Sequence, residues 1–133
     1  MKQKLLSLIL ASACLPGASV YAHHSFPATY AMSKEVVLEG ELVAFLYRNP
    51  HSVIHMMVTD EVGETTRWAV EWGAPSFLGG AGITRTTFKS GDPVIVTGNP
   101  ARDPADNRLH LVSIERVSDG LKWPTSPEGG HYD

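Results

Sequence analysis

Residues 35–47 carry an alternating pattern that limits the fold more than any other feature of the sequence. Apolar side chains recur at every second position, and Glu39 and Glu41 lie on the opposite face. The apolar face carries Val36, Leu38, Leu42, Ala44 and Leu46. A period of two residues is typical of a half-buried β-strand. Gly40 interrupts the apolar face and predicts a bend or bulge, which would let one long strand curl into a barrel.

Four later segments also have strand character and are bounded by turn residues. They cover residues 52–60, 67–72, 93–98 and 108–117, with one short helical turn near residues 75–78. The order is strand, strand, strand, short helix or loop, strand, strand. This is the order of an OB-fold, a small five-stranded, partly open Greek-key barrel. A plain β-sandwich fits the same strand count, but we favour the all-β, OB-like barrel because its first strand is long and contains Gly40.

The first 22 residues have the organisation of a cleavable secretory signal peptide. Lys2 and Lys4 give a positive start, an apolar run covers residues 5–13, and Ala22 ends a short stretch suited to signal peptidase. The apolar run is shorter than the roughly 20 residues that span a bilayer. We therefore expect export to the periplasm and no transmembrane segment. An uncleaved membrane anchor is the alternative.

The single cysteine, Cys14, lies inside this signal. Residues 11–14 weakly resemble a lipoprotein cleavage box, but Ala11 stands where a larger aliphatic residue is usual, so lipidation ranks second. Cleavage after Ala22 removes Cys14 and leaves no thiol, disulfide or cysteine metal site. The expected organisation is a signal peptide at 1–22, an N-terminal arm at 23–34, a barrel at 35–118 and a loose C-terminal tail at 119–133.

The charge balance of the mature chain bears on its partners. The sequence has 11 basic and 14 acidic residues, and removal of Lys2 and Lys4 leaves a net charge of −5 with neutral histidines. No basic run or stripe is present. Nucleic-acid binding depends largely on neutralising phosphates, so we expect no nucleic-acid partner. The same balance disfavours anionic lipid surfaces.

Several short motifs together suggest a family. In chain order they are His23-His24-Ser25-Phe26 with Tyr30, a first strand containing Gly40, Asn49-Pro50-His51-Ser52, Trp68-Ala69-Val70-Glu71, Gly73-Ala74-Pro75-Ser76, Thr84-Arg85, and Lys89-Ser90-Gly91-Asp92 before Val94-Ile95-Val96-Thr97-Gly98. With this set, the chain resembles domain of unknown function family 6152 over roughly residues 23–118. The resemblance implies an exported single domain with an OB-like barrel, and it supplies no activity. The glycine-rich residues 79–82 depart from the bulky and basic residues usual in that family.

The expected mature N-terminus suggests a metal site. Cleavage after Ala22 leaves His23 first and His24 second, and an N-terminal histidine can chelate a metal through its amine and its ring. One further imidazole would complete a three-nitrogen "histidine brace", a tetragonal donor set suited to Cu(II). The candidates for that imidazole are His51, His55 and His110.

We prefer His51, because a turn at a barrel rim can approach the arm. His51 and His55 are four residues apart, about 13 Å along a strand, so they are not expected to share one ion. The proposed metal residues are therefore His23 and His51, with His24 or His55 as a lesser contributor. The alternative is that these histidines are incidental, since six histidines in a short chain give many accidental matches.

Glu71 lies between two tryptophans on the third strand. It has two interpretations, a carboxylate that supports a metal or ligand at a pocket edge, or an ordinary outward residue. Trp68 and Trp72 share one face and are either core residues or a stacking platform for a ligand.

Signatures of common enzymes are missing from the sequence. It has no Gly-x-Ser-x-Gly elbow, phosphate-binding loop or His-Glu-x-x-His motif. We therefore expect an exported, non-enzymatic binding module, with copper as its cofactor. The alternative is a metal-free module that binds a peptide or an envelope protein partner through the open barrel face. A small metal-dependent hydrolase or oxidase is a third hypothesis, for which no residue of the sequence indicates a substrate.

Overall fold

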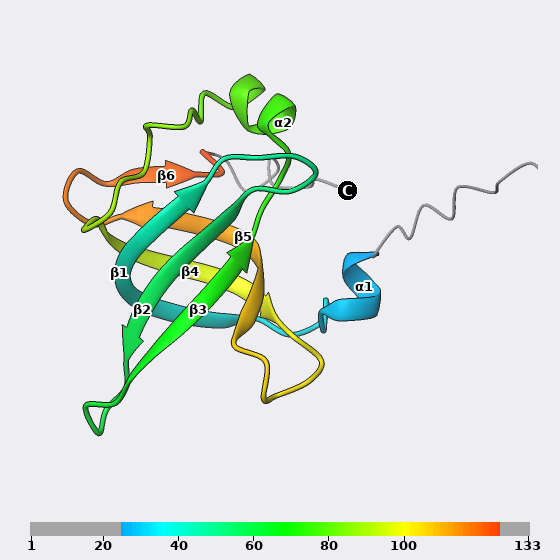
Figure 1. The fold of residues 1–133 in the computed structure, drawn as a ribbon, viewed down its shortest axis with the longest axis vertical. Helices are drawn as coiled ribbons and strands as arrows, with labels where there is room; N and C mark the ends of the chain where they lie inside the picture. Colours follow the sequence, from blue (N-terminus) through cyan, green and yellow to red (C-terminus); the bar gives the residue numbers. More distant parts are fainter. Residues whose placement is uncertain (1–24, 126–133) are drawn as a thin grey trace, which may run out of the picture.

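The computed structural model describes residues 25–125. The helices are α1 (Phe26–Thr29) and α2 (Pro75–Gly80), and the strands are β1 (Val36–Leu46), β2 (Val53–Thr59), β3 (Thr65–Glu71), β4 (Pro93–Pro100), β5 (Arg108–Arg116) and β6 (Leu121–Trp123). Figure 1 shows one curled sheet, with α2 at one end of the barrel, the β2–β3 hairpin at the other, and α1 at its side. None of the helices within the described residues is long and apolar enough to cross a membrane.

The sheet closes through one parallel strand pair. Its order is β3-β2-β1-β4-β5-β6, and the neighbours in this order are antiparallel. β3 also pairs with β5 in parallel, with Ala69, Val70 and Glu71 opposite Arg108, Leu109 and His110. This pairing joins the two sides of the sheet into a closed five-stranded barrel. The expected all-β, OB-like barrel is therefore confirmed, and the sandwich alternative is excluded.

The long strand β1 serves two neighbours in turn. Its first half, from Val36 to Glu41, pairs with β4, and its second half pairs with β2 from Glu41 onwards. Gly40 lies at this change of partner, where a Cβ atom would lie 2.1 Å from the carbonyl oxygen of Met57. Only glycine lets the two backbones approach so closely.

The prediction of which side chains of β1 face the core is wrong in the second half of the strand. The register with β2 shifts between Leu42 and Ala44, which marks a bulge or irregularity there. One extra residue in a strand moves the following side chains to the other face. Phe45 and Tyr47 therefore pack against the core, in place of the expected Ala44 and Leu46.

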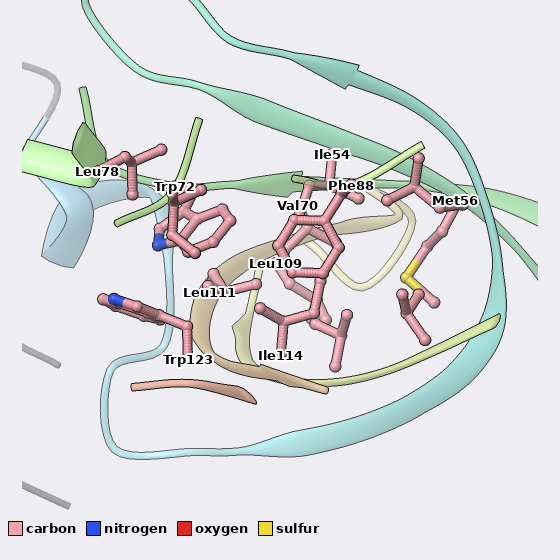
Figure 2. Packing of buried hydrophobic residues seen from close by; sticks show 14 of the residues in the cluster. Ile54, Met56, Val70, Trp72, Leu78, Phe88, Leu109, Leu111, Ile114 and Trp123 are labelled. Atoms are coloured by element: carbon pink, nitrogen blue, oxygen red, sulfur yellow. The ribbon is translucent and has the colours of Figure 1, made fainter. Parts of the chain in front are cut away.

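Sixteen apolar side chains of the described residues form the buried cluster, most of them inside the barrel. Trp72 lies at the centre of its aromatic part, with ring centroids 5.0 Å from Trp123 and 6.0 Å from Phe88. Figure 2 shows Trp72 and Trp123 beside each other, with Leu78 of α2 above them. Trp72 is fully buried and so offers no stacking platform at the surface, whereas Trp68 is partly buried and packs against the core.

The barrel extends beyond the expected boundary at residue 118. The three residues of β6 pair antiparallel with β5, with Trp123 opposite Ile114. Burial of Trp123, which is 3 % exposed, ties this strand to the core. Residues 121–123, which were expected to belong to a loose tail, therefore form part of the barrel. Helix α2 forms despite its glycines, with a proline in its first turn and Leu78 buried.

Candidate functional site

The N-terminal arm covers the outer surface of the seam between β3 and β5. Glu71 and His110 are register partners across this seam, and their neighbours Val70 and Leu109 are fully buried in the barrel. Because successive strand residues point to opposite faces, Glu71 and His110 point outward. The arm nevertheless shields this surface, since its Tyr30 is only 1 % exposed.

Backbone and side-chain hydrogen bonds hold the arm in place. The amide of Ala31 donates to the Pro100 carbonyl, and the amide of Arg102 donates to the Thr29 carbonyl, both at 2.9 Å. The guanidinium of Arg102 also donates to the Pro27 carbonyl. The arm therefore docks against the end of β4 and the loop that follows it.

Glu71 lies at the centre of the shielded network. The Tyr30 hydroxyl donates to its Oε2 at 2.5 Å, and Arg108 Nη2 donates to the same oxygen at 3.2 Å. His51 Nδ1 lies 2.8 Å from Oε1. Burial raises the pKa of Glu71, but the hydrogen bonds from Tyr30 and His51 and the charges of His51 and Arg108 outweigh it and lower the pKa below its ordinary value. Glu71 is therefore ionised at neutral pH.

The network fixes which nitrogen of each imidazole carries the proton. An ionised carboxylate only accepts hydrogen bonds, so His51 donates from Nδ1 to Glu71. The amide nitrogen of Asn99 donates to the Lys34 carbonyl at 2.8 Å, which leaves Asn99 Oδ1 to accept from His110 Nδ1 at 3.1 Å. In its neutral form, each ring therefore presents Nε2 as the nitrogen with a lone pair, the state in which histidine binds a metal.

Phe26 of the arm connects the two histidines. Its ring centroid lies 4.9 Å from that of His51 and 4.2 Å from that of His110. The arm thus contacts imidazoles from two distant positions, the β1–β2 turn and the first part of β5. Phe26 follows His23 and His24 by three and two residues in the chain.

The structure places the predicted metal residues in different parts of the molecule or does not describe them. His51 lies in the Glu71 network, while His23 and His24 lie outside the described residues. His55 lies further along β2, opposite Ala44 and Ala69. Burial and then the positive charges of Arg67 and Arg48 lower the pKa of His55. Within residues 25–125, no group of three or more His, Cys, Asp or Glu side chains is arranged to hold a metal ion.

Several residues of the network were missed from the sequence. Tyr30 appeared only as part of the family resemblance, and Arg108 and Asn99 were not singled out. His110 was named only as a candidate for the third imidazole. No local pattern could have identified them, because they come from the arm, β4 and β5 and meet only in the folded barrel.

An open pocket of about 390 Å³ adjoins the network. It is lined by residues 48–51 of the β1–β2 turn together with Val53, Glu71 and Arg108. His51 therefore faces both the shielded network and an accessible hollow.

Comparison with known families decides the membership of the chain. The family model DUF6152, described as a family of unknown function, matches residues 10–110. The chain belongs to DUF6152. The match ends within β5 and includes the segment that carries Phe26, His51, Glu71 and His110.

Known structures add little about what this DUF6152 protein binds. A small single-stranded DNA-binding protein from Streptomyces coelicolor is similar, with 19 % sequence identity and a TM-score of 0.44 over 66 % of this chain and 96 % of that one. At this similarity, DNA binding is a property of that protein alone. No curated protein sequence matches the chain.

The Tyr30–Glu71 hydrogen bond predicts how the stability of this DUF6152 domain depends on alkaline pH. Burial, the hydrogen bond to Glu71 and the Glu71 charge raise the pKa of Tyr30 above its ordinary value of 10.0. A raised pKa contributes stability that is present below pH 10 and is lost as the pH rises towards the folded-state value. We expect Tyr30→Phe to lower the free energy of unfolding by about 1–2 kcal/mol at neutral pH.

The difference between wild type and Tyr30→Phe should narrow above pH 10, because ionisation of Tyr30 accompanies unfolding only in the wild type. Urea unfolding of both proteins at about pH 8 and about pH 11 measures this difference in the free energy of unfolding. A difference that stays constant over this range would contradict the assignment.

Proposed function

We propose that this protein is an exported, non-enzymatic binding module that takes up copper at its mature N-terminus. The amine and imidazole of His23 and the Nε2 atom of His51 would be the principal ligands. His110 Nε2 is a further donor in the same region, and His24 a lesser one. The proposal requires export and cleavage after Ala22.

The position of Phe26 carries this proposal. Its ring contacts those of His51 and His110 at centroid distances of 4.9 and 4.2 Å. Three residues of extended chain span at most about 11 Å. Covalent geometry alone therefore keeps an amino terminus at His23 within reach of both imidazoles.

The hydrogen bonds around the two imidazoles also support a metal. Metal-bound histidines commonly donate their second ring N–H to a carboxylate or carbonyl, which fixes the ring and raises its basicity. Glu71 takes this place for His51, and the side-chain oxygen of Asn99 takes it for His110. Imidazole and amine nitrogens without a thiolate favour Cu(II) among the divalent first-row metals.

A Cu(II) titration of the mature protein, followed by electron paramagnetic resonance, tests the proposal. We expect one tightly bound ion per chain and a tetragonal spectrum with nitrogen donors. His51→Ala should weaken the affinity by at least about tenfold, as loss of even a supporting residue does. His55→Ala is the matched control and should change the affinity by less than about twofold, because about 13 Å of strand separates it from His51.

Two results would count against the copper site. Weak binding of several ions would indicate incidental histidines and redirect the search to peptide or envelope protein partners. Equal losses from His51→Ala and His55→Ala would show that the ion lies elsewhere on the barrel.

A further inference from the structure

We propose that the open pocket beside His51 binds a small organic anion, a ligand with carboxylate or phosphate groups. The pocket is lined on one side by the β1–β2 turn and on the other by Glu71 and Arg108. It lies on the outer surface of the barrel, next to the docked arm. This inference goes beyond the proposed copper site, because it concerns the pocket's own charged groups.

The charges of the lining residues favour an anion. Arg108 donates to Glu71, so the one acidic group of the pocket is already compensated. Arg48 is exposed and makes no hydrogen bond or ion pair with another residue of the described chain. The lining therefore carries one uncompensated guanidinium, a planar group whose N–H donors match the oxygens of carboxylates and phosphates.

The positive character extends beyond the pocket along β2. Burial and the positive charges of Arg67 and Arg48 lower the pKa of His55, which lies two residues after Val53 of the pocket. Such a patch is unexpected in a mature chain that carries more acidic than basic residues. The excess of negative charge elsewhere would favour anion binding at this position over the rest of the surface.

The size and lining of the pocket favour an organic ligand over a bare ion. Pockets for small molecules commonly measure about 300–1,000 Å³, and this one measures about 390 Å³. Pro50 and Val53 add apolar surface, while Arg48, Asn49 and His51 add polar groups. A small polycarboxylate can contact both kinds of surface at once.

Nuclear magnetic resonance of the arginine side chains tests this site in metal-free mature protein. Citrate is the main probe, and inorganic phosphate is the smaller one. We expect citrate to shift the Nε–Hε signals of Arg48 and Arg108 together and saturably, and to bind more tightly than phosphate. The absence of metal makes the result independent of the copper proposal, which can fail or succeed separately.

Matched charge variants separate a pocket from general attraction. Arg48→Gln should weaken citrate binding by about fivefold, the upper range for an exposed ion pair. Lys122→Gln removes the same charge from β6, where Lys122 pairs with Glu115 outside the pocket lining, and should weaken binding by less than about twofold. Three results would overturn the proposal: no saturable shift with citrate, equal weakening by the two variants, or tighter binding of a single-stranded oligonucleotide at the same arginines.

Discussion

Three alanines placed ahead of His23 are expected to lower the Cu(II) affinity of the mature protein by at least about a hundredfold. Loss of a residue that only supports a metal ligand costs 10- to 100-fold, and this extension removes a ligand itself. It converts the His23 amine into a peptide nitrogen, and the new terminal amine lies three residues away from the His23 ring. His51 and His110 remain on the barrel, so a weaker site with imidazole donors should persist.

The control is an extension that a protease can remove. Cleavage back to His23 should restore the affinity, as measured by a competition titration against a copper chelator. Circular dichroism and urea unfolding should be the same before and after cleavage, since the barrel strands begin at Val36. If the extended and native proteins bind copper alike, the amine is not a ligand and the brace is wrong.

Gly40→Ala is expected to destabilise the barrel by about 3 kcal/mol, the upper range for forcing an extra methyl group into a packed site. The new Cβ would lie 2.1 Å from the Met57 carbonyl oxygen and 3.1 Å from the Met56 side chain. The nearest atom is backbone, so β2 itself must move away from β1. The strand pairing that begins at Glu41 and Met57 would be disturbed at its first residue pair.

Gly80→Ala provides the matched control for this substitution. Gly80 lies at the end of α2, is exposed, and has no atom within 4 Å of an added Cβ. We expect it to change the free energy of unfolding by less than about 1 kcal/mol, since alanine favours helix more than glycine does. Urea unfolding of both variants measures the difference. Equal effects would show that the close approach at Gly40 relaxes without cost.

The strands could be predicted because each buries one face, which produces an alternation of apolar and polar residues in the sequence. The expected segments agree with β1 to β5 to within about two residues, the usual uncertainty of strand ends. The bulge after Leu42 could not be predicted, since Val43, Ala44, Phe45 and Leu46 are all apolar and fit either face. β6 was missed because three residues carry too little pattern.

The candidate site was predicted only where residue type and chain position were informative. The turn containing His51 was expected near the arm, and Phe26 does contact His51. The role of Glu71 could not be decided, because an outward position on a strand is usually solvated. Its protection comes from Tyr30, 41 residues away, and such a distant contact leaves no local pattern in the sequence.

The parallel pairing of β3 with β5 means that the Glu71 network exists only in the closed barrel. Glu71 and His110 are opposite one another only when these strands pair, and this pairing closes the sheet into a barrel. A chain with four strands in place has the turn, the arm and the core residues, yet it has no shielded carboxylate. Any ligand that requires this arrangement binds only the finished barrel and so selectively stabilises it. Ligand occupancy would thus distinguish mature molecules from folding intermediates in the compartment where folding is completed.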